Sequence, residues 1–375
     1  MPNQARLHED ASYIAVGGLG GLGRCLTTWL ADHGAKHIVA LSRSGAKDAD
    51  SRAFISDIRR RGVNLIAPPC DVVSADAVVA LAQELKRSGL PPVRGIINSA
   101  MVLRDTLFDD MTEDDWRTAL ASKVRGSQNL HATFKSLDFF VMMSSIVTVR
   151  GNYGQSNYSA ACSFQDTFVR HMVQQGEPAF SINIGPIRDV GYVSENPEVA
   201  EALRRNGLGS IGVSDVLIVL NHAIMNARNG DPNTCVASIG LIPSDDEAEN
   251  GRDFLMTDRR FSQLVKHDSG AQKSAGETLD AITLLSAATQ LDEAVEIVTN
   301  AILNQLSKLI ATPVEMLSPA QSLDSYGVDS LVAVELRNWI GAYLQANVQL
   351  MVIRGTGSIS QLAAIVAKES RVVKL

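Results

Sequence analysis

The chain has 375 residues, of which 45% are hydrophobic and 20% are charged, and its formal net charge is −7. This length predicts two or three domains, and the composition is ordinary for a globular protein with a hydrophobic core. An acidic chain is a poor match for nucleic acid, because phosphate binding needs a basic surface. No apolar run approaches the roughly eighteen residues that cross a bilayer. The first residues lack the apolar stretch of a secretory signal, so we expect a cytoplasmic protein with no membrane partner.

Four cysteines lie far apart in the chain, at Cys25, Cys70, Cys162 and Cys235. No two of them form a Cys-x-x-Cys pair, which argues against both a disulfide framework and a structural zinc site. We therefore expect no metal, and we expect at least three of the cysteines to be buried, reduced thiols.

Short apolar runs alternate with amphipathic stretches from Tyr13 to about Ser181. The runs that predict strands are 13–16, 38–41, 64–67, 95–98 and 139–143, and helical spacing occurs at 23–33, 51–61, 75–87 and 114–130. Strands that alternate with helices form a parallel sheet covered on both faces. The pattern predicts an α/β domain with a doubly wound parallel sheet of the Rossmann type.

The composition changes after Ile242. The stretch 243–250 is acidic and suits a surface loop, whereas 266–277 is rich in Ser, Gly, Ala and Lys and suits an inter-domain linker. Beyond it, apolar residues recur at helical spacing in 291–311, 330–344 and 358–367, which predicts a small helical bundle. The expected division is a first domain at 1–265, a linker at 266–282 and an all-α domain at 283–370.

A glycine-rich turn joins the first predicted strand to the first predicted helix. Glycines permit the tight turn and let the backbone approach a pyrophosphate at the helix N-terminus. Both Gly-x-Gly-x-x-Gly and Gly-x-x-x-Gly-x-Gly fit the run, so the spacing alone leaves two dinucleotide-binding families open. The candidate cofactor residues of this turn are Gly17, Gly18, Leu19, Gly20, Gly21, Leu22 and Gly23.

The choice of cofactor depends on the residues that follow the second strand. Arg43 lies twenty residues after Gly23, beside Ser42. A guanidinium and a hydroxyl suit a 2′-phosphate, whereas an NAD site would place a carboxylate there to bind the ribose hydroxyls. We therefore predict NADPH as the cofactor.

Three further residues belong to the predicted cofactor site. Asp71 follows the third strand and suits either a contact to the adenine edge or a cap of the helix that begins near Ser74. Val72 is its neighbour, and Asn98 ends the fourth predicted strand.

A serine and a tyrosine carry the chemistry of proton transfer to a carbonyl. Ser145 ends an apolar strand and Tyr158 follows thirteen residues later, an arrangement typical of short-chain dehydrogenases and reductases. Lys123 lies on the preceding helical stretch rather than four residues beyond the tyrosine. In this placement of the lysine the chain resembles the ketoreductases of type I polyketide synthases and of animal-type fatty acid synthases.

The resemblance implies roles for these residues. Tyr158 would be the proton donor and Ser145 would hold the carbonyl oxygen. Lys123 would orient the ribose and, with the positive charge of oxidised nicotinamide, lower the pKa of the tyrosine. The family usually has asparagine four residues after the tyrosine, but this chain has Cys162. Because a thiol is a weak donor, a catalytic proton relay through this position would be impaired.

The segment 326–337 places Ser330 at the start of an amphipathic helix, after a loop. It resembles the attachment motif of acyl carrier domains, which implies 4′-phosphopantetheine on Ser330 and a phosphopantetheinyl transferase as a partner. Ser330 also suits a plain N-cap, and the two roles are compatible. Residues 280–335 hold eight acidic side chains and one basic one, Lys308. Such a surface suits docking on basic patches of partner enzymes.

The order of the two domains resembles the C-terminal region of fungal highly reducing iterative polyketide synthases. This resemblance implies NADPH-dependent reduction of a β-ketoacyl thioester tethered to the chain's own carrier, with other synthase domains as partners. No Gly-x-Ser-x-Gly motif follows the carrier, which argues against a terminal thioesterase and weakens the fatty acid synthase alternative. Asp105, in Leu103-Arg104-Asp105, resembles the mark of ketoreductases that make a D (3R-type) hydroxyl; the alternative is a solvated carboxylate.

Two other functions stay open. One is a free-standing reductase of small ketones to which a carrier is fused. The other is a nonenzymatic carrier and docking fragment whose reductase is disabled by Cys162.

Overall fold

The structure is a computed structural model that describes residues 4–205, 209–241, 284–286, 288, 290–310, 312–328 and 330–373. The chain divides into two compact units, Met1–Asp246 and Glu247–Leu375. The expected linker at 266–282 and the acidic stretch at 243–250 lie outside the described residues, so the linker boundaries stay a prediction.

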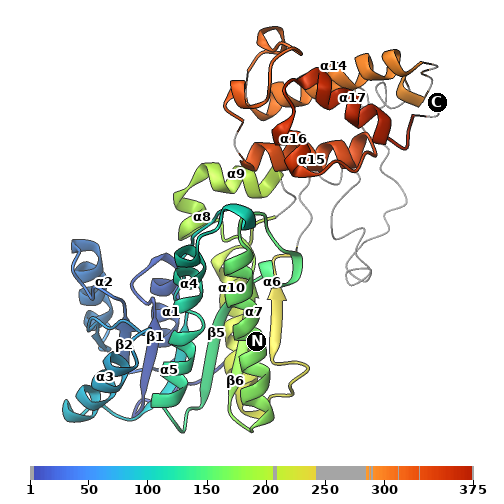
Figure 1. Ribbon diagram of the computed structural model, residues 1–375. Helices are drawn as coiled ribbons and strands as arrows, with labels where there is room; N and C mark the ends of the chain where they lie inside the picture. The colour runs from blue at the N-terminus through green and yellow to red at the C-terminus, as the bar shows by residue number, and fades with distance from the viewer. Residues whose placement is uncertain are drawn as a thin grey trace. The chain divides into compact units, whose positions relative to one another are not determined.

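The first unit is built on a parallel sheet of seven strands in the order β3-β2-β1-β4-β5-β6-β7 (Figure 1). The chain order reverses between β1 and β4, and in sheets of this kind ligands bind where the carboxyl ends of the strands meet such a reversal. The doubly wound parallel sheet expected from the sequence is confirmed. The strands are β1 (Ser12–Val16), β2 (His37–Leu41), β3 (Asn64–Ile66), β4 (Val93–Asn98), β5 (Phe139–Ser145), β6 (Ala179–Ile184) and β7 (Val236–Ile239).

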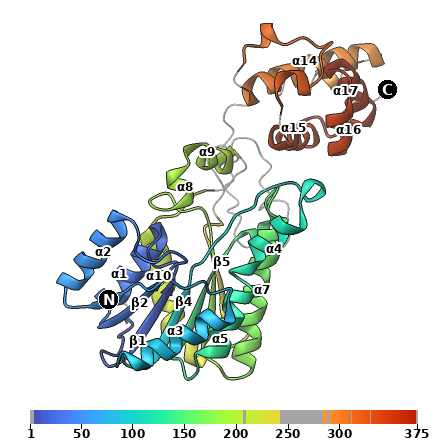
Figure 2. The same ribbon diagram turned by 60° about the vertical axis from the view of Figure 1, so that its left-hand side comes forward.

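Helices cover both faces of this sheet (Figure 2). One face packs against α1, α2 and α10, and the other packs against α3, α5 and α7. The helices of the first unit are α1 (Gly21–Asp32), α2 (Ala49–Arg60), α3 (Ala75–Arg87), α4 (Glu113–Ala121), α5 (Arg125–Thr133), α6 (Val147–Arg150), α7 (Ser156–Gln174), α8 (Tyr192–Glu195), α9 (Pro197–Arg205) and α10 (Val213–Asn226). Short 3₁₀ turns are η1 (Phe108–Asp110) and η2 (Ala227–Asn229).

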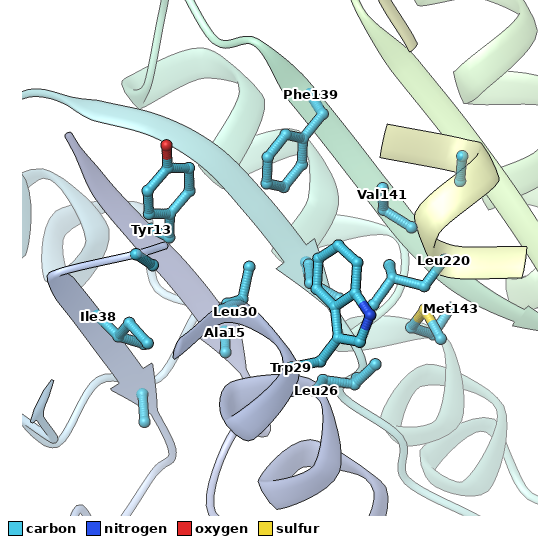
Figure 3. Close-up of a cluster of buried hydrophobic side chains, with 14 of the residues drawn as sticks. Tyr13, Ala15, Leu26, Trp29, Leu30, Ile38, Phe139, Val141, Met143 and Leu220 are labelled. Atoms are coloured by element: carbon cyan, nitrogen blue, oxygen red, sulfur yellow. The ribbon is translucent and has the colours of Figure 1, made fainter. Parts of the chain in front are cut away.

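The core on the α1 side is a cluster of large side chains from helix and sheet (Figure 3). Leu26, Trp29 and Leu30 of α1 are spaced three and four residues apart, which puts them on one face of the helix. In the sheet, the rings of Tyr13 and Phe139 stack with their centroids 5.9 Å apart. Burial of these apolar side chains stabilises the sheet, and the sheet in turn supports the loops at the carboxyl ends of its strands.

The prediction of a single helix over 114–130 is wrong, because the structure has two helices there, α4 and α5. The interruption contains Lys123, whose side chain is only 1% exposed and whose Nζ donates to the carbonyl oxygen of Met143 on β5 at 2.7 Å. The break therefore coincides with a buried contact between the lysine and a strand. Periodicity along one segment carries no signal for such a contact.

The second unit is a small helical bundle. Its three predicted helices are present as α14 (Leu291–Leu309), α15 (Ser330–Tyr343) and α17 (Ile359–Glu369). A further helix in the described part of this unit, α16 (Leu350–Gly355), was not expected, because six residues are too few to show a helical period. Two 3₁₀ turns, η4 (Val314–Met316) and η5 (Asp324–Tyr326), precede α15. The bundle has its own core, to which Val298, Leu336 and Leu362 contribute.

Within the described ranges, no helix is both long and apolar enough to cross a bilayer.

Candidate active site

The glycine turn between β1 and α1 needs glycine at specific positions. Gly17 has φ +76°, and a Cβ at Gly23 would lie 1.9 Å from the carbonyl oxygen of Gly17. A Cβ at Gly21 would lie 2.7 Å from the backbone nitrogen of Gly191, and one at Gly18 would lie 2.8 Å from Ala15 O. At Gly20 the nearest atom would be 3.5 Å away, an ordinary contact. The geometry therefore requires the Gly-x-x-x-Gly-x-Gly pattern in full, whereas Gly-x-Gly-x-x-Gly includes one glycine that the fold does not need.

The N-terminus of α1 has no capping side chain. Gly20 is its N-cap residue and supplies no side-chain acceptor to the first turn. The first N–H groups of a helix have no partner within the helix, and its N-terminus carries a partial positive charge. Leu19 is buried in the core and Leu22 packs against it, so these two residues of the run anchor the turn through apolar contact. The turn has the shape and the free donors that a pyrophosphate needs.

Ser42 and Arg43 lie where β2 ends, at the same edge of the sheet. The main chain of Ser42 is held by a hydrogen bond from Cys70 N to its carbonyl oxygen at 2.9 Å. The side chain of Arg43 is exposed, and it makes no salt bridge with any carboxylate in the described part of the chain. Its guanidinium is thus available to an anionic group.

Asp71 is exposed, and its carboxylate accepts a hydrogen bond from Val73 N at 3.0 Å. The cap of α3 is Ser74, whose hydroxyl accepts from Ala77 N, so the alternative role of Asp71 as a helix cap is not observed. Val72 is buried, and its carbonyl oxygen accepts from Asn129 Nδ2 at 2.9 Å.

Asn98 is fully buried at the end of β4. Its Nδ2 donates to Ser127 Oγ at 3.0 Å, and its side-chain oxygen accepts from Ala100 N at 3.2 Å. Both contacts are within the protein, and through them the side chain holds the loop after β4 in place.

Tyr158, Ser145 and Lys123 come together at the carboxyl end of β5. The Ser145 hydroxyl lies near the Tyr158 hydroxyl and lowers the pKa of the phenol. The ammonium nitrogen of Lys123 lies 5.4 Å from the centre of the Tyr158 ring. The residues come from β5, from α7 and from the break between α4 and α5, so the fold unites three groups that are far apart in the sequence.

Burial raises the pKa of the Tyr158 phenol well above its ordinary value. The neighbouring Cys162 and Asp105 raise it further, and the neighbouring Ser145 hydroxyl opposes the shift. For the protein by itself the pKa of the phenol is thus raised, because desolvation of the phenolate is the largest effect. The lowering expected from Lys123 together with oxidised nicotinamide concerns the complex and stays a prediction. The phenol stays protonated at neutral pH and can act as an acid.

Cys162 occupies the interior of the site. It is fully buried, and its thiol lies near the Tyr158 hydroxyl and raises the pKa of the phenol. Burial raises the pKa of this thiol, and the Lys123 cation lowers it in part. The thiol is thus a neutral neighbour of the tyrosine, and its effect on the pKa of the phenol is opposite to that of Ser145.

Asp105 lies in the loop after β4. Its carboxylate accepts a hydrogen bond from Gln155 Nε2 at 2.7 Å. Although the residue as a whole is solvent-accessible, surrounding atoms desolvate its carboxyl group, which raises its pKa, and the bond from Gln155 opposes this. The carboxylate is therefore held by Gln155 and is not simply solvated.

Ser330 begins α15 in the second unit. Asp329, and the side chains of Ser330 and Leu331, are outside the described part of the structure. The loop before the helix passes through Gly327, which has φ +69°, and Val334 and Leu336 are buried. The helix is thus fixed by its apolar face just beyond the serine.

Comparison with known proteins assigns both units. Residues 11–189 match the family described as "KR domain", and residues 288–374 match "Highly reducing polyketide synthase sdgA, C-terminal ACP domain". The chain is 93% identical over its whole length to the highly reducing polyketide synthase easB of Emericella nidulans. The chain belongs to the fungal highly reducing polyketide synthases. It is also 53% identical, over 99% of its length, to the highly reducing polyketide synthase cm3B of Cordyceps militaris.

This polyketide synthase chain spans only 15% and 14% of the lengths of those two relatives. Solved structures resemble its ketoreductase domain. One, titled "Structure of A-type Ketoreductases from Modular Polyketide Synthase", has 28% identity and a TM-score of 0.58 over 64% of this chain and 50% of that one. The first-module ketoreductase of phoslactomycin biosynthesis has 30% identity and a TM-score of 0.55 over 60% and 52%. The ketoreductase assignment thus agrees with the fold.

Two glutamines of the ketoreductase domain, which were not predicted from the sequence, contact the site residues. Gln155 binds Asp105, and Gln165 Oε1 accepts from Lys123 Nζ at 3.1 Å. A signal for Gln165 was present, because it lies seven residues after Tyr158 and so on the same face of an amphipathic helix. A polar residue on a buried helical face is expected to have a specific partner.

Proposed function

We propose that the ketoreductase domain reduces a β-ketoacyl thioester to the β-hydroxyacyl thioester with NADPH. The acyl chain would be carried on 4′-phosphopantetheine at Ser330. The observation that supports this most strongly is the meeting of Tyr158, Ser145 and Lys123 at the sheet edge that also carries the glycine turn.

The residues at this edge suit NADPH, which supplies the hydride when it is bound. The uncapped first turn of α1 suits the pyrophosphate, and the close backbone approach between Gly17 and Gly23 leaves no room for a side chain there. The exposed guanidinium of Arg43, with Ser42 beside it, suits the 2′-phosphate. Asp71 and Val72, which follow the third strand, would contact the adenine, and Asn98 holds the loop after β4 through its hydrogen bonds.

The proton for the carbonyl oxygen would come from Tyr158. Ser145 donates a hydrogen bond to that oxygen and polarises the carbonyl. As the carbonyl carbon accepts the hydride, the oxygen takes the phenolic proton, and the phenolate later regains a proton from solvent. Lys123, at 5.4 Å from the ring centre, stabilises the phenolate that forms.

Attachment at Ser330 is supported by its place at the start of α15, directly after the turn at Gly327. A phosphopantetheinyl transferase would transfer the phosphopantetheine arm of CoA to the serine hydroxyl and release 3′,5′-ADP. The thiol of the arm would then hold the acyl chain. Acidic side chains around this segment, of which Asp324 is exposed, suit contacts with basic surfaces of other synthase domains.

The presence of Cys162 favours a second candidate function, that of a carrier fragment whose reductase domain is inactive. The Cys162 thiol raises the pKa of the neighbouring Tyr158 phenol, and a thiol is a weak donor for a proton relay through this position. NADPH binding distinguishes the two functions at once, because a disabled reductase that also fails to bind the cofactor fits only the second.

The whole proposal can be tested on the full chain in one reaction. Incubation of the apo-protein with a phosphopantetheinyl transferase and acetoacetyl-CoA should load Ser330 with the β-ketoacyl arm. NADPH should then add two hydrogen atoms to the mass of the loaded protein, with equal oxidation of the cofactor. Loading without reduction, or reduction of a small ketone with the same kcat/KM as the tethered thioester, would contradict it.

A further inference from the structure

A row of buried polar side chains lies beneath Tyr158. Lys123 Nζ donates to Met143 O at 2.7 Å and to Gln165 Oε1 at 3.1 Å. We propose that Gln165 is a positioning residue that holds the Lys123 ammonium beside the tyrosine. This inference rests on the proposed function, in which Lys123 stabilises the phenolate of Tyr158.

The orientation of the Gln165 amide is determined by its other partner. Gln165 is fully buried, and its Nε2 donates to Ser127 Oγ at 3.3 Å. Ser127, also fully buried, accepts in addition from Asn98 Nδ2 at 3.0 Å. Because the amide nitrogen is directed to Ser127, the amide oxygen is directed to the ammonium. The row thus links the end of β4, through α5 and α7, to the lysine.

The charge of Lys123 makes this contact necessary. A buried ammonium is costly unless its N–H groups are hydrogen-bonded, and Lys123 forms no salt bridge with a carboxylate in the ranges that the structure describes. Two neutral oxygens accept two of its three N–H groups, and Gln165 supplies the only one of these from a side chain. The third N–H is left for the reaction site.

Other titratable groups also act on this region. Tyr158 and Cys162 face the ammonium from α7, and the Lys123 cation lowers the pKa of the Cys162 thiol. Asp166 on α7 acts on that thiol in the opposite direction, and Asp105 from the loop after β4 raises the pKa of Tyr158. None of these groups accepts a hydrogen bond from Lys123, whereas Gln165 does.

Helix α7 explains how one element supplies both parts. Gln165 follows Tyr158 by seven residues, which is two helical turns and the same face. Tyr158 and Gln165 are therefore held by the same helix, whereas the Lys123 ammonium that Gln165 positions comes from the break before α5.

The test measures the charge state of Lys123 directly on the full chain. The chemical shift of Lys123 Nζ, followed by ¹⁵N NMR of lysine-labelled protein as the pH is raised, gives the midpoint at which the buried amine loses its proton. In Gln165→Leu this midpoint should fall by about one pH unit, because the charged form loses an acceptor. In Gln165→Glu it should rise, because a carboxylate favours the ammonium. Gln174→Leu, the same change on an exposed residue of the same helix, should leave it unchanged.

Turnover gives the second measurement. For Gln165→Leu we expect kcat to fall about tenfold or more with a smaller change in KM for the thioester, since the loss concerns the reaction step. A fall in kcat without any shift of the midpoint would show that Gln165 only packs, and would overturn the proposal, as would a midpoint that stays within about 0.3 unit in both variants. If Gln165→Leu does not fold, the upward shift in Gln165→Glu decides alone. If the unmutated protein does not oxidise NADPH at all, the proposed function fails, while the NMR midpoints of Lys123 still test the contact.

Discussion

Asp105 and Gln155 join the loop after β4 to the start of α7 through a hydrogen bond of 2.7 Å from Gln155 Nε2 to the Asp105 carboxylate. The same two segments meet through a backbone hydrogen bond from Thr106 N to Gly154 O at 2.9 Å. Gln155 comes three residues before Tyr158 and leads into α7. The loop that carries Asp105 is therefore fixed relative to Tyr158, as the proposed role of Asp105 in guiding a substrate requires.

Substitution of Asp105 should reduce the control of product configuration. We expect the unmutated protein to make predominantly the D (3R-type) hydroxyl, and Asp105→Ala to lower the ratio of D to L by about fivefold, the effect of losing one hydrogen bond worth ~1 kcal/mol. Chiral chromatography of the reduced thioester measures this ratio. Asp109→Ala, an exposed carboxylate in η1, is the matched control and should leave it unchanged. A predominantly L product from the unmutated protein would refute the role of Asp105.

Replacement of Tyr158 by phenylalanine should remove the acid and keep the ring. The rate of reduction should fall by roughly 10²- to 10⁴-fold, as is typical for a positioned acid, while NADPH binding survives. Ser145→Ala should cost less, because water can polarise the carbonyl in part. Stopped-flow oxidation of NADPH measures both variants. If Tyr158→Phe keeps more than about a tenth of the rate, the proton comes from another group.

The raised pKa of Tyr158 also predicts a pH profile. Because the phenol is the protonated, acidic form below its pKa, and burial moves that pKa upward, ionisation of Tyr158 should not reduce the rate between about pH 6 and pH 9. A decline in kcat within that range that disappears in Tyr158→Phe would contradict a raised pKa.

The preference for NADPH should depend on Arg43. A charge-assisted contact to a phosphate is worth about 1.5–3 kcal/mol, so Arg43→Ala should narrow the ratio of NADPH to NADH affinity by roughly ten- to a hundredfold. Fluorescence titration with both cofactors gives the two dissociation constants. Arg87→Ala, which removes an exposed arginine at the end of α3, should leave the ratio as it is. Equal affinities in the unmutated protein would show that the choice of NADPH is wrong.

Attachment of phosphopantetheine should require Ser330. Incubation with CoA and a transferase should add one arm to the unmutated protein and none to Ser330→Ala, as intact-mass spectrometry will show. Ser325→Ala, an exposed serine in η5 five residues before it, should be modified normally. Addition of the arm to Ser330→Ala would mean that the carrier serine lies elsewhere.

The sequence by itself determined the features that are encoded locally. The strand, glycine turn and helix at Gly17 to Gly23 are adjacent in the chain, and so are the apolar faces of α14, α15 and α17, so that periodicity and backbone chemistry are enough to predict them. The spacing of Ser145 and Tyr158 and the motif around Ser330 are likewise local patterns, which is why the amino-acid sequence is enough to recognise both domains.

Only the tertiary structure decided how the site residues act on one another. The hydrogen bonds of Lys123 to Met143 O and to Gln165 join residues at least twenty positions apart, and they accompany the break between α4 and α5. Local periodicity in the sequence carries no information about such contacts. The pKa of Tyr158 is raised and not lowered because it depends on how many atoms exclude water from the phenol, a property of packing. The bond between Asp105 and Gln155 depends in the same way on two segments fifty residues apart. The sequence states which residue types are present, but the distances between their side chains and the dielectric environment around them are set only by the folded structure.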